Sequence, residues 1–191
     1  TLFRELQTAI TPYSTCKPES PDYIAPFERT GPGRALDGEP RYDLERWNPE
    51  FFERLHAFLR GAEERDIIVE VVLFSNTYSD SVWGLNPLNP ANNITLNESI
   101  PWFGYLTCRH PELLMWQQAH LRRIVEETNC YGNIFYEICN EPGAFINVEK
   151  DLPTIAEVNH WQNKMIALIR EVESGMPRQH LIAGQEAMFR A

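Results

Sequence analysis

The sequence contains no apolar run that approaches the roughly 18–20 residues of a membrane-spanning helix. It contains no CxxC pair either, because its cysteines (Cys16, Cys108, Cys130 and Cys139) are widely spaced. This spacing argues against a zinc knuckle or a thioredoxin-type site. No glycine-rich loop follows any predicted strand, which disfavours a dinucleotide-binding domain.

Basic residues are scarce relative to acidic ones. The 191-residue chain has 17 Lys and Arg against 27 Asp and Glu, giving a net charge of −10. Such an excess repels nucleic-acid phosphates and anionic lipid headgroups. We therefore expect no nucleic-acid partner, no membrane partner, and a neutral or cationic substrate. With 43% hydrophobic and 12% aromatic residues, the composition is that of a folded domain.

Three amphipathic helices are predicted from capping residues and apolar periodicity. Asn48-Pro49-Glu50 supplies a cap, a proline at the first helical position and an acid near the positive helix end. A second helix opens at Pro111. The third begins at a capping box formed by Thr154 and Glu157 and ends before Pro177.

Short apolar runs between these helices are typical of strands buried on both faces. They cover residues 67–74, 133–139 and 181–183, and Leu2-Phe3 reads like the end of another strand. Strand–helix alternation indicates a parallel sheet with helical crossovers. Two long loops, residues 8–46 and 75–109, each follow a strand and precede a helix. Loops in that position carry the active sites of parallel α/β folds.

These elements predict the α/β class, specifically a (β/α)8 TIM barrel. A complete barrel averages about 250 residues, so we expect this chain to hold roughly strands 2 to 5. Residues 1–191 would then be part of a single (β/α)8 catalytic domain whose C-terminal portion is missing.

One segment carries a chemical signal: Tyr136-Glu137-Ile138-Cys139-Asn140-Glu141-Pro142. The pair Asn140-Glu141 ends an apolar strand, and Pro142 terminates it. A carboxylate at the C-terminal mouth of a parallel strand points into the site, and partly desolvated surroundings would raise its pKa as a general acid requires. The alternative is a glutamate that only caps the next loop or helix.

The strand followed by Asn-Glu-Pro resembles the fourth strand of clan A glycoside hydrolases, the cellulase-like (β/α)8 family. The match extends over most of the chain. It includes residues 42–49 before a helix, residues 68–74 as the third strand, Asn92-Asn93 at the end of its long loop, and His180-Leu181-Ile182 as the fifth strand.

The resemblance implies that Glu141 is the acid/base and that Asn140 hydrogen-bonds the 2-hydroxyl of the sugar. The retaining mechanism also requires a nucleophile about 5–5.5 Å from the acid/base. In the family that glutamate ends the seventh strand, so we expect it beyond Ala191. Glu186 is the tempting substitute, but it follows the wrong strand for the clan.

Sugar-binding candidates lie in the 75–109 loop. Sugars present apolar C–H faces edged by hydroxyls, which suit aromatic rings beside amides. We predict substrate contacts by Asn76, Tyr78 and Trp83, although aromatics also anchor long loops. The histidines form no metal set with carboxylates at ligand spacing, so no metal and no cofactor is expected.

Two further acids, Glu70 and Glu137, lie inside the predicted apolar strands, where a charged side chain is unusual. Buried acids must be paired or neutral. We expect them to form a structural layer bridged to an arginine; a supporting role that tunes the pKa of Glu141 is the functional alternative.

Taken together, the sequence predicts a retaining glycoside hydrolase that cleaves the O-glycosidic bonds of a β-linked oligo- or polysaccharide by double displacement. The alternative is a catalytically inactive carbohydrate-binding barrel or half-barrel. The compartment and the oligomeric state are not encoded in any recognisable motif.

Overall fold

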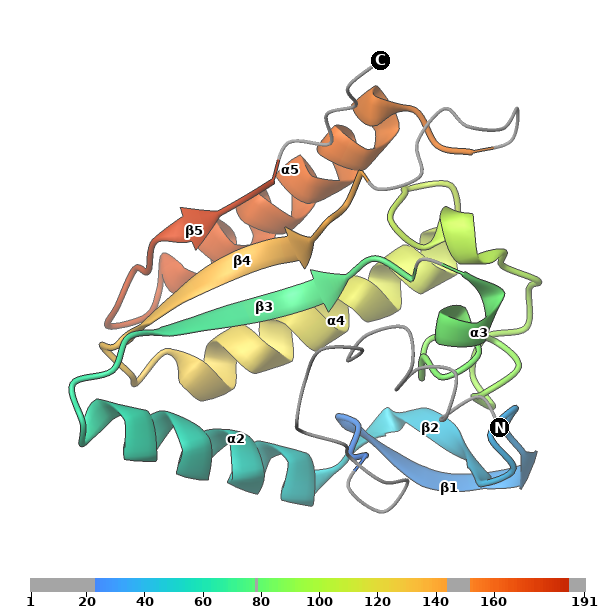
Figure 1. Cartoon of the computed structure of the whole chain (residues 1–191), viewed down its shortest axis with the longest axis horizontal. Coiled ribbons are helices and arrows are strands. Elements are labelled where there is room, and N and C mark those ends of the chain that lie inside the picture. Colours follow the sequence, from blue (N-terminus) through green and yellow to red (C-terminus); the bar gives the residue numbers. More distant parts are fainter. Residues whose placement is uncertain (1–22, 78, 144–151, 186–191) are drawn as a thin grey trace, which may run out of the picture. The chain divides into compact units, whose positions relative to one another are not determined.

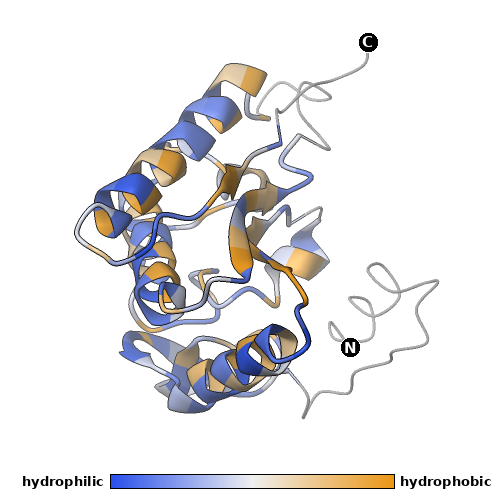
Figure 2. Cartoon of the chain, turned by 90° about the vertical axis from the view of Figure 1, so that its left-hand side faces the viewer, coloured by the Kyte–Doolittle hydropathy of each residue, from blue (hydrophilic) through white to orange (hydrophobic). Residues whose placement is uncertain are grey.

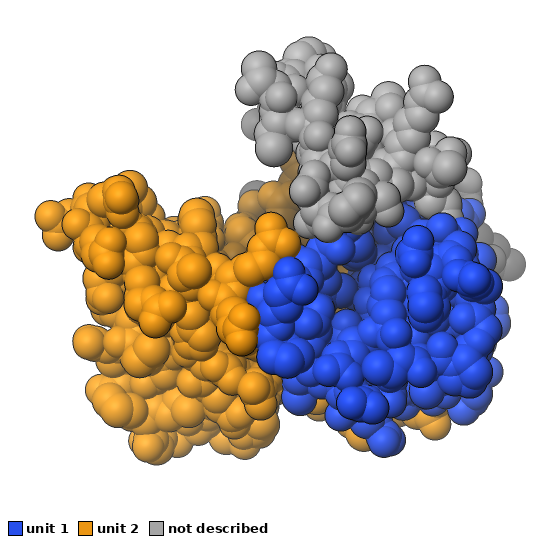
Figure 3. Space-filling view, turned by 90° about the horizontal axis from the view of Figure 1, so that it is seen from below, with its two compact units in different colours: residues 1–51, 77–102 blue, residues 52–76, 103–191 orange. Residues whose placement is uncertain are grey.

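The computed structural model describes residues 23–77, 79–143 and 152–185. The chain divides into two compact units (Figure 3). Unit 1 comprises Thr1–Phe51 and Thr77–Trp102, and unit 2 comprises Phe52–Asn76 and Phe103–Ala191. Among the described residues each unit has one sheet, which is antiparallel with two strands in unit 1 and parallel with three strands in unit 2.

Unit 1 is built on a hairpin of β1 (Phe27–Arg34) and β2 (Pro40–Trp47). The strands pair antiparallel, with register shifts along their length. Stacked rings of Phe27 and Trp47, with centroids 4.8 Å apart, join the ends of the hairpin away from the turn. In the turn Gly38 adopts a φ of 91°, a conformation that glycine adopts without steric penalty.

The second described stretch of unit 1, residues 79–102, is a long loop with one helical turn, α3 (Asp80–Trp83). Buried asparagine side chains hold this loop through its main-chain groups. Asn93, fully buried, donates to the carbonyls of Pro87 and Asn89 and accepts from the N–H groups of Thr95 and Leu96. A buried loop must satisfy its polar backbone in this way, so the amides explain how a segment with little regular structure is ordered.

Unit 2 contains a parallel sheet in the order β3-β4-β5 (Figure 1). The strands are β3 (Val69–Ser75), β4 (Ile134–Asn140) and β5 (Ile182–Ala183). Alternate side chains of β4 point to opposite faces. Tyr136 is fully buried and its hydroxyl lies 2.8 Å from that of Thr128 on a neighbouring helix. Glu137 has the opposite parity and lies on the other face.

Three helices of unit 2 are α2 (Pro49–Glu63), α4 (Pro111–Thr128) and α5 (Ile155–Glu173). The predicted helix starts are confirmed. Asn48 accepts a hydrogen bond from the N–H of Glu50 at 3.1 Å, and Thr154 and Glu157 form the complete capping box. Figure 2 shows apolar and hydrophilic residues alternating along the helices. A short 3₁₀ turn, Trp102–Gly104, precedes α4.

The helix layer is held by buried amides as well as by apolar contacts. The indole of Trp161 on α5 donates to the Gln117 side chain on α4 at 3.0 Å, and Gln117 donates to the Tyr105 carbonyl at 2.7 Å. Trp161 and Gln117 are both fully buried. Since a buried amide without partners would be destabilising, this chain of bonds fixes α4 against α5.

The predicted (β/α)8 TIM barrel is wrong. The described residues form a small mixed α/β structure, with a two-stranded antiparallel sheet and a separate three-stranded parallel sheet, and they are not a portion of a barrel. Residues 27–47, placed by sequence in a long loop and a helix leader, pair with each other as a hairpin. The predicted strands at 67–74, 133–139 and 181–183 are confirmed, but strand–helix alternation is common to open sheets and barrels.

None of the helices in the described part of the chain is long and apolar enough to cross a membrane.

Candidate functional site

Polar side chains follow all three parallel strands of unit 2 at the point where each strand ends. Asn76 follows β3, Asn140 and Glu141 end and follow β4, and Gln185 comes two residues after β5. Carboxyl ends of parallel strands meet at one edge of a sheet, where α/β proteins place their sites. We name this set of Asn76, Glu137, Asn140, Glu141 and Gln185 the amide–carboxylate cluster.

Glu141 has an unusual backbone. Its φ is 49°, in the left-handed region that non-glycine residues adopt with strain, and Pro142 follows it directly. The residue before a proline normally adopts an extended conformation, so this geometry must be held by neighbours. Its side chain is exposed, in contrast to the partly desolvated carboxylate expected from sequence.

Two side-chain amides hold the main chain of Glu141. The Nδ2 of Asn76 donates to the Glu141 carbonyl at 3.0 Å, and the Glu141 N–H donates to Oε1 of Gln185 at 3.1 Å. In addition, the Asn76 N–H donates to the Asn140 carbonyl at 3.2 Å. The peptide groups on both sides of the Glu141 Cα are therefore anchored, one to the end of β3 and one to the end of β5.

Gln185 also connects Glu141 to Glu137. Its Nε2 donates to Oε1 of Glu137 at 2.8 Å, so a single amide bridges the buried carboxylate and the main chain of the exposed one. Glu137 is 7% exposed. Burial raises the pKa of its carboxyl, and the negative charge of Glu70 raises it further, while the Gln185 hydrogen bond lowers it.

The expected arginine bridge to these acids is not present among the described residues. The hydrogen-bond partner of Glu137 is the neutral amide of Gln185, and Glu70 is exposed. An amide satisfies one lone pair of the carboxylate without neutralising its charge. Glu137 consequently stays a desolvated acid beside a second acid, which is the arrangement that favours its protonated form.

We predict that Glu137→Gln stabilises the protein at neutral pH. The folded-state pKa of Glu137 lies above its unfolded value, so its charge opposes folding at pH 7, and this opposition disappears as the pH falls through the folded-state pKa. The variant keeps an acceptor for Gln185. Thermal unfolding should give a higher Tm than wild type at pH 7.5, with the gap closing towards pH 4. An equal gap at both pH values would contradict the assigned desolvation.

The other predicted site residues fall in different parts of the chain. Tyr78 and Glu186 lie outside the described residues. Trp83 belongs to unit 1, where it is 3% exposed and its indole donates to the Ile100 carbonyl at 2.8 Å. Within that unit Trp83 therefore anchors the loop. Asn76 is 7% exposed, and its amide is used to hold Glu141.

Residues 16–106 match the family model described as Domain of unknown function (DUF6298). The match covers less than half of the chain. It spans β1, β2, α2, β3 and α3 and therefore includes Asn76, whereas Asn140, Glu141 and Gln185 lie beyond it. No curated protein and no solved structure matches the chain.

Sequence reasoning missed Gln185. Its only signal is positional: it is a polar residue just after an apolar strand, as Asn76 and Asn140-Glu141 are after theirs. In the described part of the chain no group of three or more His, Cys, Asp and Glu side chains is arranged to hold a metal ion. The cluster itself holds two carboxyl groups in different environments, Glu137 buried and Glu141 exposed, and the amides that position them.

Proposed function

We propose that the protein is a retaining glycoside hydrolase that acts on a β-linked glycan, with Glu141 as the acid/base. The observation that carries this proposal is the left-handed backbone of Glu141, held by Asn76 and Gln185. Such strain is typically about 1–3 kcal/mol and is concentrated at functional sites. A glutamate that merely ended the strand would have no need of it.

The proposed reaction has two steps. In the first, protonated Glu141 gives its proton to the glycosidic oxygen as the bond to the anomeric carbon breaks and a carboxylate nucleophile attacks that carbon. In the second, Glu141, now a carboxylate, takes a proton from water, and the water oxygen displaces the nucleophile from the anomeric carbon. Two inversions give net retention.

The neighbours of Glu141 have supporting roles in this proposal. Asn140 would hydrogen-bond the 2-hydroxyl of the sugar at the cleavage point, an interaction that strengthens in the transition state. Gln185 acts as a positioning residue, because it holds the Glu141 N–H and the Glu137 carboxylate at once. The net charge of −10 favours a neutral glycan over an anionic one.

The test is the stereochemistry of the first product. The protein is incubated with a panel of β-linked oligosaccharides, and the anomer released first is identified by proton NMR before mutarotation. We expect the β-anomer. A 2-deoxy-2-fluoro β-glycoside should in addition trap the nucleophile as a covalent adduct that peptide mass spectrometry locates. An α-anomer would exclude double displacement, and binding without cleavage of any substrate would leave a carbohydrate-binding protein.

A further inference from the structure

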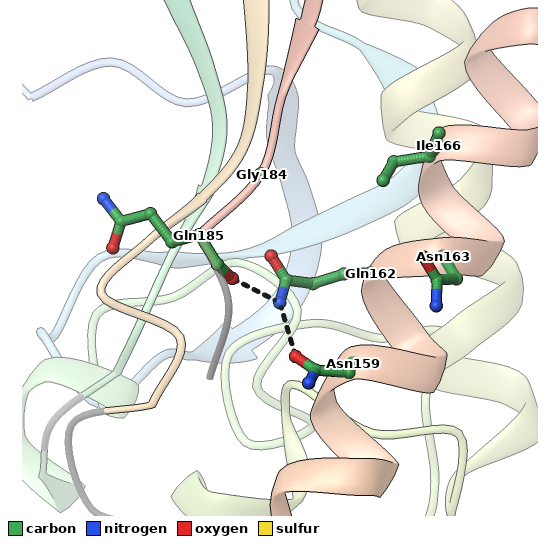
Figure 4. A pocket seen from close by; sticks show the side chains of 6 residues that line it. All are labelled: Asn159, Gln162, Asn163, Ile166, Gly184 and Gln185. Carbon is green, nitrogen blue, oxygen red and sulfur yellow. Dashed lines mark hydrogen bonds between the residues drawn. The ribbon is translucent and has the colours of Figure 1, made fainter. Parts of the chain in front are cut away.

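A second feature of unit 2 lies beside the amide–carboxylate cluster. A cavity of about 280 Å³ opens between α5 and the segment that follows β5 (Figure 4). Its lining comprises Asn159, Gln162, Asn163, Ile166, Gly184 and Gln185. Figure 4 shows the Gln185 side chain turned away from α5 while its main-chain carbonyl faces Gln162. The cavity is thus bounded by the main chain of Gln185, and the cluster is bonded to its side chain.

The buried side chain of Gln162 presents a hydrogen-bond acceptor at this cavity. The residue is 5% exposed. Its Nε2 donates to the Gln185 carbonyl at 2.8 Å and to Oδ1 of Asn159 at 3.3 Å, which fixes the orientation of the amide. Its Oε1 is buried and has no hydrogen-bond partner among the described residues. Since an unsatisfied buried acceptor is destabilising by roughly 1–3 kcal/mol, a hydrogen-bond donor placed there by a ligand would be stabilising.

The lining excludes charged ligands. All polar side chains that line the cavity are amides, and no acid or base is among them. A cation would find no carboxylate to compensate for its desolvation, and an anion would face the acceptor of Gln162. A hydroxyl, by contrast, donates to Oε1 and accepts from a neighbouring amide, while Ile166 offers an apolar surface to C–H groups.

We propose that this cavity is a binding site for a neutral, polyhydroxylated ligand the size of a single sugar ring. The volume of about 280 Å³ lies just below the roughly 300–1,000 Å³ of pockets for drug-sized ligands, which suits one ring better than a chain of several. The site is separate from Glu141, so binding here does not require hydrolysis there.

Gly184 provides a direct way to fill the cavity. A Cβ built on Gly184 would lie 3.9 Å from Oε1 of Gln162 and 3.9 Å from Cδ1 of Ile166, both of which line the cavity. These are ordinary van der Waals distances, so alanine fits without displacing a neighbour. Compared with alanine, Gly184→Leu places three further carbons in the space proposed for the ligand. Lys164→Gln is the control, because Lys164 is an exposed residue of α5 that does not line the cavity.

The experiment is a titration of the protein with neutral monosaccharides: glucose, galactose, mannose, xylose and arabinose. Calorimetry should give a Kd of roughly millimolar order for at least one of them. Lys164→Gln should leave the Kd within about threefold, and Gly184→Leu should weaken binding at least about tenfold. Glucuronate and glucosamine, the charged counterparts of glucose, should bind more weakly than the neutral sugar.

Two further measurements address the case in which the Gly184→Leu variant does not fold and separate sugar binding from the proposed hydrolysis. If Gly184→Leu does not fold, amide NMR of the wild-type protein locates binding, because the Gly184 N–H and the side-chain NH₂ groups of Gln162 and Asn163 should shift on titration. Glu141→Gln should abolish hydrolysis and leave this binding intact, which separates the two proposals. No response to any neutral sugar at 50 mM (about fiftyfold above a Kd of 1 mM), or shifts confined to other residues, would overturn the inference.

Discussion

Replacing Glu141 by glutamine is expected to slow the hydrolysis of an unactivated β-linked glycan by roughly 10²–10⁴-fold, the usual contribution of a general acid–base group. Glutamine has nearly the same size and accepts and donates hydrogen bonds, but it cannot give a proton to the leaving oxygen. Its main-chain bonds to Asn76 and Gln185 are unaffected by the change, since they involve backbone atoms of residue 141. The loss should therefore be chemical and not structural.

The leaving group separates this role from a general loss of binding. A dinitrophenyl β-glycoside leaves without protonation, so Glu141→Gln should impair its glycosylation step far less than that of the natural glycan. With such a substrate, Glu141→Ala plus sodium azide should yield a β-glycosyl azide, because the small anion replaces water in the second step where the base is absent. Equal impairment of both substrates, without azide product, would contradict the acid/base assignment.

Controls for this substitution are available on the same chain. Glu126→Gln changes an exposed carboxylate on α4 and should leave turnover within about twofold, since surface changes of this kind have small effects.

Gln185→Ala tests the positioning role of Gln185. It removes the acceptor of the Glu141 N–H, so we expect kcat to fall more than KM rises, because the substrate is bound by other groups while the proton donor is misplaced.

Local signals predicted the elements that depend on local chemistry. The helix starts were predicted from three capping residues, Asn48, Thr154 and Glu157. These residues form their hydrogen bonds within one helical turn, and the structure contains those bonds. The three apolar runs became β3, β4 and β5, because a short apolar run is itself a local signal of a buried strand. Asn140 and Glu141 were accordingly placed at the end of a strand correctly.

The β1–β2 hairpin was not predictable in the same way. Phe27–Arg34 contains a proline and two glycines, and much of it is exposed, so it shows neither clean alternation nor a continuous apolar run. Its pairing with β2 has irregular register and is decided by contacts between segments. The barrel prediction was wrong for the same reason. The number of strands that join a sheet depends on contacts between segments, and the sequence of a single strand does not indicate it.

The candidate site was predictable only in part for a related reason. Asn140-Glu141 is contiguous in sequence and forms a motif, whereas Asn76 and Gln185 reach it from strands 65 and 44 residues away. An isolated amide after a strand has no distinguishing pattern. The arginine expected beside Glu137 was inferred from the general need to pair buried charge, but the hydrogen-bond partner of Glu137 is the neutral Gln185 amide, and burial raises the pKa of its carboxyl.

A buried hydrogen-bonded pair, Glu173 and His180, supports the largest stability effect that we predict. Glu173, at the end of α5, is 1% exposed. Its carboxylate accepts from the His180 main-chain N–H at 2.9 Å and from the Asn129 amide at 3.1 Å, and Nδ1 of His180 lies 2.6 Å away. Nε2 of His180 lies 2.7 Å from the Tyr131 carbonyl, which can only accept. Both ring nitrogens of His180 therefore face oxygen atoms, and the buried Glu173 carboxyl makes three polar contacts.

Glu173→Gln should therefore lower the free energy of unfolding by about 3–5 kcal/mol, the usual loss when one partner of a buried pair is removed. The new amide nitrogen would face donors that the carboxylate now accepts from, which leaves a buried donor without an acceptor. Glu171→Gln is the matched control on the same helix, because Glu171 is 69% exposed in its bridge to Arg122, and such surface pairs contribute only about 0–1 kcal/mol. Urea unfolding of both variants measures the difference, and similar small losses in the two would contradict a large contribution of the buried Glu173 contacts. Because Glu173 joins α5 to the segment leading into β5, the weakened protein should also lose amide protection first at Ile182 and Ala183, the strand that brings Gln185 to Glu141.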